Sequence, residues 1–206
     1  MKRWHMASVR AALVMVVAGS AFAAPLNPNS FTVVGDGTFN PSSGVTVDTT
    51  AMTMSGGETA TGVDWGGVAV FTFNSFTLPT GVTIIVTPGG SRPVALLSKS
   101  TMTIGGTINI SASGSIGGAG GRGETLGLGA PAWAVNAGAG FGGNGGSSPL
   151  GSGGISYGNL QSVLVGGSGG GNNGFGDGRG GGGGGALELG SIGTLTLAAS
   201  SVINAN

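Results

Sequence analysis

Nine short apolar runs, each with polar residues at alternating positions or at its ends, fall into three blocks of three. The runs are 70–73, 76–78 and 82–86 in the first block, 95–98, 102–104 and 108–110 in the second, and 186–189, 195–197 and 202–203 in the third. Runs of this length, rich in Val, Ile, Thr and Phe and bounded by turn residues, predict β-strands. We therefore expect an all-β protein in which a unit of three short strands recurs.

The spacing of the blocks indicates a repeat. Phe71 and Leu96 hold equivalent positions in the first two blocks, and Leu187 holds the same position in the third. The two intervals are similar in length once the glycine-rich segment 114–185 is left out. A unit of this size cannot bury its own apolar face, but copies stacked on one another can. The pattern predicts a short right-handed parallel β-helix, or solenoid. A β-sandwich whose strands share a similar pattern is the alternative.

Alternation within the runs predicts which side chains enter the core. Successive side chains of a strand point to opposite faces. Met102 and Ile104 are therefore expected to face inward and Thr103 outward, and Leu195 and Leu197 are expected to face inward in the same way.

Composition divides the chain into five segments. They are a leader (1–23), an irregular N-terminal β segment or cap (24–67), solenoid coils (68–113), a glycine-rich insertion (114–185) and a further coil (186–206). The second segment holds three strand candidates, at 31–34, 45–47 and 51–54. The last coil ends without a polar cap, so we expect that another chain covers its edge or that the solenoid belongs to a longer protein.

Glycine dominates the insertion, where it occupies nearly half of the positions. Apolar residues such as Leu126 and Ile155 punctuate the segment, unlike a flexible linker of glycine and serine. Because glycine permits close backbone approach, we expect a long lateral loop pinned to the side of the solenoid, in part as packed polyproline-II-like segments. A largely mobile loop is the alternative.

The segment 1–23 has the pattern of a secretory signal. Basic residues precede an apolar stretch at 11–18, and the small-x-small site Ala21-Phe22-Ala23 follows. The alternative is a short N-terminal membrane anchor. The protein is thus expected to be exported to the periplasm, the cell surface or the medium, with no transmembrane segment after signal cleavage.

Composition excludes several kinds of chemistry. The chain has no cysteine, and cleavage would remove its only histidine, His5, so nucleophilic triads and the usual zinc ligands are excluded. The cleaved chain would have four basic and seven acidic residues. Its net charge of −3 argues against nucleic acid as a partner. Most acids lie in turns, and alternation places Glu188 opposite the inward Leu187 and Leu189. We expect no catalytic residue and no cofactor.

Aromatic residues of the insertion are the candidates for ligand contact, because they could stack on sugar rings or instead anchor the loop by burial. The candidates are Trp133, Phe141, Tyr157 and Phe175. Asp177, in Gly174-Phe175-Gly176-Asp177-Gly178, is a weak metal-ligand candidate, since this stretch is similar to part of a calcium-binding glycine repeat. A single carboxylate in a glycine turn is more typical of a turn former.

Three stretches carry a resemblance to a known group. They are Gly89-Gly90-Ser91-Arg92-Pro93-Val94-Ala95-Leu96-Leu97-Ser98, Ile104-Gly105-Gly106-Thr107-Ile108-Asn109-Ile110, and Gly180 to Gly185 followed by Ala186-Leu187-Glu188-Leu189. Over residues 68–206 the chain resembles the glycine-rich exported bacterial β-helix proteins, called PE-PGRS-like or adhesin-like. The N-terminal helical domain of the mycobacterial proteins has no counterpart here.

The resemblance and the composition together predict a secreted or cell-surface structural or adhesive module. Its expected partners are surface glycans, extracellular matrix, or further copies joined through the solenoid ends. The alternative functions are a β-helix carbohydrate-active enzyme and a glycan-binding module.

Overall fold

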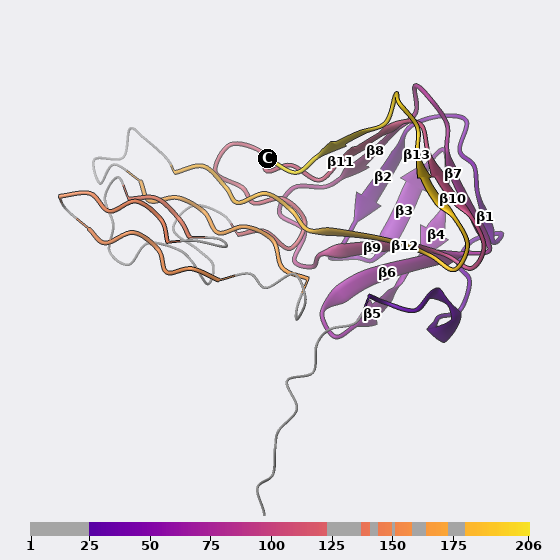
Figure 1. The fold of residues 1–206 in the computed structure, drawn as a ribbon, viewed down its shortest axis with the longest axis horizontal. Helices are drawn as coiled ribbons and strands as arrows, with labels where there is room; N and C mark the ends of the chain where they lie inside the picture. Colours follow the sequence, from indigo (N-terminus) through magenta and orange to yellow (C-terminus); the bar gives the residue numbers. More distant parts are fainter. Residues whose placement is uncertain (1–24, 123–136, 141–143, 150, 158–163, 173–179) are drawn as a thin grey trace, which may run out of the picture.

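The computed structural model describes residues 25–122, 137–140, 144–149, 151–157, 164–172 and 180–206. These residues form fourteen strands and one short 3-10 helix (Figure 1). The elements are η1 (Pro28–Ser30), β1 (Thr38–Phe39), β2 (Val45–Asp48), β3 (Thr53–Gly56), β4 (Ala60–Thr61), β5 (Val63–Trp65), β6 (Val68–Phe73), β7 (Ser75–Leu78), β8 (Thr83–Val86), β9 (Val94–Ser98), β10 (Met102–Ile104), β11 (Thr107–Asn109), β12 (Leu187–Ser191), β13 (Leu195–Leu197) and β14 (Val202–Asn204).

The strands form three sheets. Their orders are β1-β7-β10-β13, β14-β11-β8-β2-β3-β4 and β12-β9-β6-β5. Sheet pairing is parallel except around β3, β4 and β5, which pair antiparallel with their neighbours. The prediction of an all-β protein is confirmed.

Consecutive strands form units that pair in parallel with one another. We call β6–β7–β8 the first unit, β9–β10–β11 the second unit and β12–β13–β14 the terminal unit. Each strand of the second unit lies between its counterparts in the other two units, one in each sheet. The runs at 102–104 and 195–197 form β10 and β13 with the predicted bounds, whereas the run at 108–110 begins one residue earlier, at Thr107.

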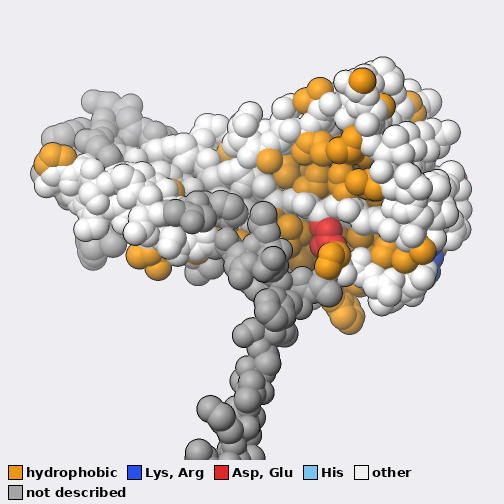
Figure 2. All heavy atoms as spheres, in the orientation of Figure 1, with side chains coloured by type: hydrophobic (Ala, Val, Ile, Leu, Met, Phe, Trp, Pro, Cys, Tyr) orange, Lys and Arg blue, Asp and Glu red, His pale blue; other side chains and the backbone are white. Residues whose placement is uncertain are grey.

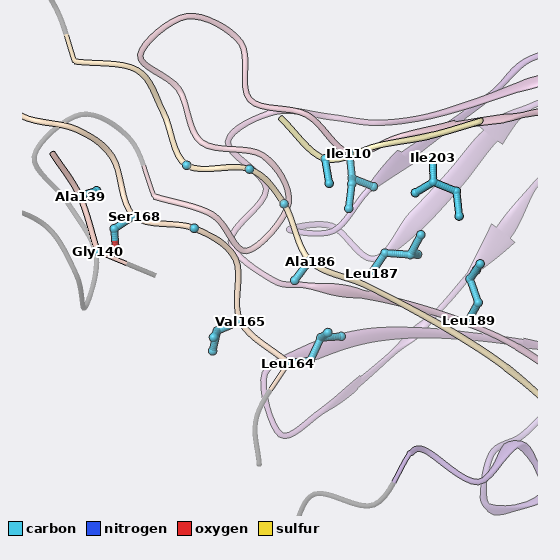
Figure 3. A pocket seen from close by; sticks show the side chains of 15 residues that line it. Ile110, Ala139, Gly140, Leu164, Val165, Ser168, Ala186, Leu187, Leu189 and Ile203 are labelled. Carbon is cyan, nitrogen blue, oxygen red and sulfur yellow. The ribbon is translucent and has the colours of Figure 1, made fainter. Parts of the chain in front are cut away.

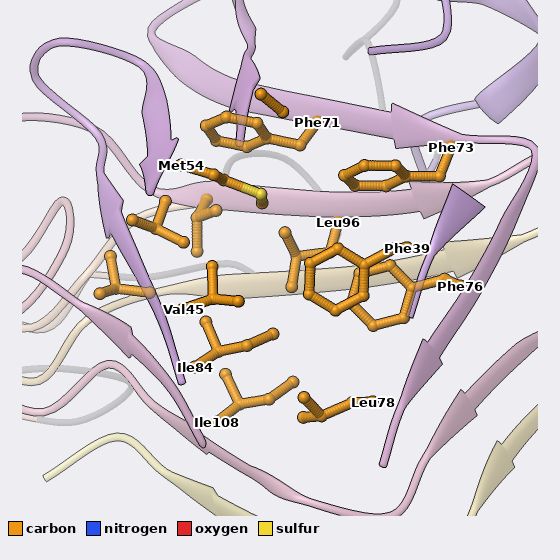
Figure 4. Close-up of a cluster of buried hydrophobic side chains, with 14 of the residues drawn as sticks. Phe39, Val45, Met54, Phe71, Phe73, Phe76, Leu78, Ile84, Leu96 and Ile108 are labelled. Carbon is orange, nitrogen blue, oxygen red and sulfur yellow. The ribbon is translucent and has the colours of Figure 1, made fainter. Parts of the chain in front are cut away.

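Registered pairing brings inward side chains of successive units into columns between the sheets (Figure 4). One column places Phe39, Phe76 and Met102 in order across β1, β7 and β10. Ile84 and Ile108 are registered in the same way on another sheet. All five side chains are buried, within one continuous apolar core. Met102 and Ile104 therefore face inward, and Thr103 is exposed, as the alternation predicts.

The N-terminal segment covers the core beside the first unit. Strand β2 pairs in parallel with β8, and β3 and β4 continue that sheet antiparallel. Met54 of β3 and Ala60 of β4 are buried in the same core as the units. Two of the three strands predicted in this segment are wrong, one in its start and one altogether, whereas the predicted run at 45–47 lies within β2.

The predicted strand at 51–54 starts too early, because β3 begins only at Thr53. Met52 has a φ of 57° and completes the turn from β2. The predicted strand at 31–34 does not form. Phe31 instead ends the turn of η1 and packs outside the sheet on Val70 and Leu97, so its burial does not require a strand.

The segment around η1 crosses the outer face of the sheet β12-β9-β6-β5. At one side of this sheet, the Leu26 N–H donates a 2.6 Å hydrogen bond to Glu188 Oε1 on β12. At the other side, the Phe31 ring meets Trp65 of β5 edge-on, with ring centroids 5.5 Å apart. This sheet is therefore covered on both faces, which explains why β9 is buried along its whole length.

Candidate contact surfaces

The terminal unit presents an apolar face. Leu195, Leu197 and Ile203 are registered on Met102, Ile104 and Ile108, whose side chains are fully buried. The three terminal-unit side chains nevertheless remain 41%, 52% and 42% exposed, because no described strand lies on their other side. Figure 2 shows hydrophobic side chains gathered in this part of the molecule.

A cavity of about 710 Å³ adjoins this face (Figure 3). Leu187, Leu189 and Ile203 line it from the terminal unit, and Leu164 and Val165 line it from the glycine-rich insertion. Its volume falls in the range of small-molecule sites. The lining is apolar side chains and glycine backbone, with Ser168 as its polar side chain. Neither Leu164 nor Val165 was identified from the sequence as a site residue, because only the fold brings residues 164–165 beside β12.

The described part of the insertion, which we call the glycine arm, lies beside the three sheets (Figure 1). Backbone hydrogen bonds join its segments in closed rings. In one ring Arg122 N–H donates to Gly167 O (2.9 Å), Gly167 N–H to Gly184 O (2.8 Å), and Gly183 N–H to Arg122 O (2.9 Å). A flat sheet cannot pair each of three strands with both others, so these segments form a bundle.

A second ring has the same form farther along the arm. Gly138 N–H donates to Gly146 O (2.8 Å), Gly145 N–H to Gly154 O (2.9 Å), and Gly154 N–H to Gly138 O (2.9 Å). A Cβ atom on Gly145 would collide with the Gly138 carbonyl. A Cβ on Gly153 would collide in the same way with the Gly145 carbonyl. The glycine content thus serves close backbone approach at these positions.

Carboxylates of the described residues accept hydrogen bonds from backbone N–H groups. Such bonds are typical of turn formers and caps. The partners are Thr38 for Asp36, Thr50 and Ala51 for Asp48, Thr59 for Glu58, Gly67 for Asp64, and Leu26 for Glu188. Glu188 lies opposite Leu187 and Leu189 in β12, as alternation predicts, and it holds the N-terminal segment on the sheet.

One ion pair is found among the described residues. Arg92 Nε donates to Asp64 Oδ2 at 2.9 Å, and Arg92 also reaches the carbonyl of Thr50. The Gly67 N–H, followed by Arg92, holds the pKa of Asp64 below its ordinary value of 3.8. This cluster ties the β5–β6 turn to the turn after β2, and it offers no second carboxylate to a ligand.

The aromatic candidates for ligand contact have different outcomes. Tyr157 is partly buried, and its O–H donates to the Gly166 carbonyl at 2.9 Å, so it takes part in the arm's own hydrogen bonding. Trp133, Phe141 and Phe175 lie outside the described residues, as do Asp177 and the leader at 1–23. Trp65 of β5 is 57% exposed and is the large aromatic side chain that the described surface offers to solvent.

Within the stretches that the structure describes, no helix has the length and apolar character to cross a bilayer. The same stretches hold no group of three acidic or histidine side chains arranged to bind a metal ion.

No protein-family model, curated protein or solved structure matches the chain.

Proposed function

We propose that this chain is an exported structural and adhesive module, built as a short right-handed parallel β-helix with a glycine-rich lateral arm. It acts through contact with surface glycans or matrix in the periplasm, at the cell surface or outside the cell. The registered parallel pairing of the three units supports the solenoid, and the pattern of residues 1–23 supports export.

The observation that supports the adhesive role is the structure of the glycine arm. Closed rings of backbone hydrogen bonds hold its described segments together. One ring includes Gly183 and Gly184, which lie four and three residues before the start of β12, so the arm is joined to the units at its base. An ordered projection on a stack of strands presents backbone groups and a few apolar side chains to a partner. Loops held on a rigid scaffold are a common position for binding surfaces.

Deletion of the arm tests the adhesive role. Joining Ser113 to Ala186 removes residues 114–185 and leaves the pairing strands of all three units intact. Both proteins are tested on a glycan array and on immobilised matrix proteins. We expect the full chain to bind a subset of these surfaces and the deletion variant to lose that binding. Equal binding by the two proteins, or no binding by the full chain, contradicts the proposal.

A second variant is available if the deletion fails to fold. Gly145→Ala places a methyl group against the Gly138 carbonyl, whereas Gly146→Ala, at the next position, meets no atom within 4 Å. The first variant is expected to weaken binding and the second to preserve it.

Export is tested separately on the native protein in its own cells. Cell fractionation and intact-mass measurement are expected to find it outside the cytoplasm with its N-terminus at Ala24. A cytoplasmic product that retains Met1 contradicts export and leaves the binding test unaffected.

A further inference from the structure

The two ends of the stack of units differ. At the first unit, antiparallel strands β3, β4 and β5 continue or cover the sheets, and Phe39 and Met54 are buried there. At the terminal unit, β12, β13 and β14 each pair on one side with the second unit, and none pairs with a described strand on its other side. The apolar columns therefore end in half-exposed side chains at one end only.

Exposed strand edges of this kind are usually protected by Lys, Pro or inward-pointing charges. The terminal segment 186–206 contains no Lys, Arg or Pro, and Glu188 is its only charged residue. The carboxylate of Glu188 lies on the outer face of the sheet, where it accepts the hydrogen bond from Leu26. The face between the sheets therefore carries no charged side chain, and the apolar side chains of two such faces can bury one another.

We propose that a second copy of this chain covers the terminal unit, head to head, in a closed two-fold dimer. Stacking in the opposite sense, with the terminal unit on the first unit, would require an exposed apolar face at the first-unit end, where Phe39, Met54 and Ala60 are already buried. Only the two terminal faces are then available to each other. Because both copies use the same face, the contact is isologous and stops at two chains.

The symmetry determines how the strands meet. A two-fold axis in the plane of the face reverses the direction in which the strands run around the unit, so edge strands meet antiparallel. An axis through the centre of β12, the longest edge strand, places β12 against β12 of the second copy and β13 against β14. The arm joins the unit at the start of β12. This axis therefore places the two arms at different corners.

Native mass spectrometry and sedimentation of the full chain test the dimer. The variant Leu195→Lys with Leu197→Lys puts charges on the face, and Thr196→Lys puts one on the outer side of the same strand as a matched control. We expect a dimer for the wild type and for Thr196→Lys, and a monomer for the double variant with its unfolding transition preserved. A monomeric wild type overturns the proposal. The same holds if the monomer carries an apolar small molecule in the cavity, since that ligand would then cover the face instead of a second copy. Open stacks of more than two chains also overturn it.

Cross-linking keeps the proposal testable if the double variant does not fold. The chain has no cysteine, so a single introduced thiol is unambiguous. Leu189→Cys lies at the centre of β12, opposite its own copy across the proposed axis. Thr103→Cys, exposed on the outer side of the second unit, is the control. Mild oxidation is expected to link Leu189→Cys into a covalent dimer and to leave Thr103→Cys monomeric under denaturing conditions, and failure of Leu189→Cys to link counts against the dimer.

Discussion

Phe39 lies parallel to Phe76, with ring centroids 4.1 Å apart and planes 6° apart. The two residues are also registered partners on adjacent parallel strands, β1 and β7. Stacked rings in register begin the column that continues through Met102 to Leu195. The short strand β1 thus joins the core mainly through one buried ring.

The stacked pair predicts a measurable coupling. Phe39→Leu, Phe76→Leu and the double variant should show a coupling free energy of about 0.5–1.5 kcal/mol in urea unfolding, because each single change already removes the ring contact. Phe31→Leu combined with Phe76→Leu is the control, since Phe31 packs in a separate apolar cluster. That control pair should be additive within about 0.5 kcal/mol. Additivity for Phe39 and Phe76 would show that the rings do not interact.

The contact between Glu188 and Leu26 predicts a difference between two substitutions. Glu188→Ala removes the acceptor from the partly buried Leu26 N–H, whereas Glu188→Gln keeps an acceptor oxygen. We expect Glu188→Ala to lower the free energy of unfolding by about 1–2 kcal/mol and Glu188→Gln by less. Limited proteolysis should also cleave the N-terminal segment faster in Glu188→Ala. Identical unfolding curves for the two variants would contradict a holding role for this carboxylate.

Substitutions at two adjacent glycines of the arm are expected to differ in their effect on the arm's hydrogen bonding. Gly145→Ala forces a methyl group into the Gly138 carbonyl, while Gly146→Ala projects into open space. Overpacking of this kind costs about 1–3 kcal/mol. Hydrogen exchange at the Gly138 and Gly154 amides should therefore accelerate in the first variant and stay near wild type in the second. The amides of β9 and β10 serve as an internal reference and should not change in either protein.

Asp64 predicts a pH dependence of stability. Its pKa is lowered in the folded state by the Gly67 N–H and by Arg92, so the folded state favours the charged carboxylate. This contribution is present above the unfolded pKa, near 3.8, and is lost as the pH falls through the lowered folded value. The stability difference between wild type and Asp64→Asn, measured by urea unfolding, should shrink on acidification through this range. A difference that is constant with pH would contradict the assignment.

Strand positions in the units were predictable because each run alternates and is bounded by turn residues. The runs at 102–104 and 195–197 form strands with the predicted bounds. The run at 31–34 was predicted wrongly because Phe31 is buried outside the sheet, against Val70 and Leu97, without strand pairing. Local pattern reports that a side chain is apolar, and it does not report which face of which sheet will cover it.

Local alternation and composition were enough to define the strand-forming units, their inward and outward side chains, and the absence of cysteine chemistry, because these properties act over a few residues. Tertiary packing was needed to show that Met102 is buried while its registered neighbour Leu195 is 41% exposed. Equivalent positions in a repeat have the same local pattern, and burial depends on whether a further layer lies on them. The same holds for part of the glycine arm. A Cβ on Gly166, Gly182 or Gly183 would collide with the backbone of a segment distant in sequence, so contact distance rather than local preference requires glycine at these positions.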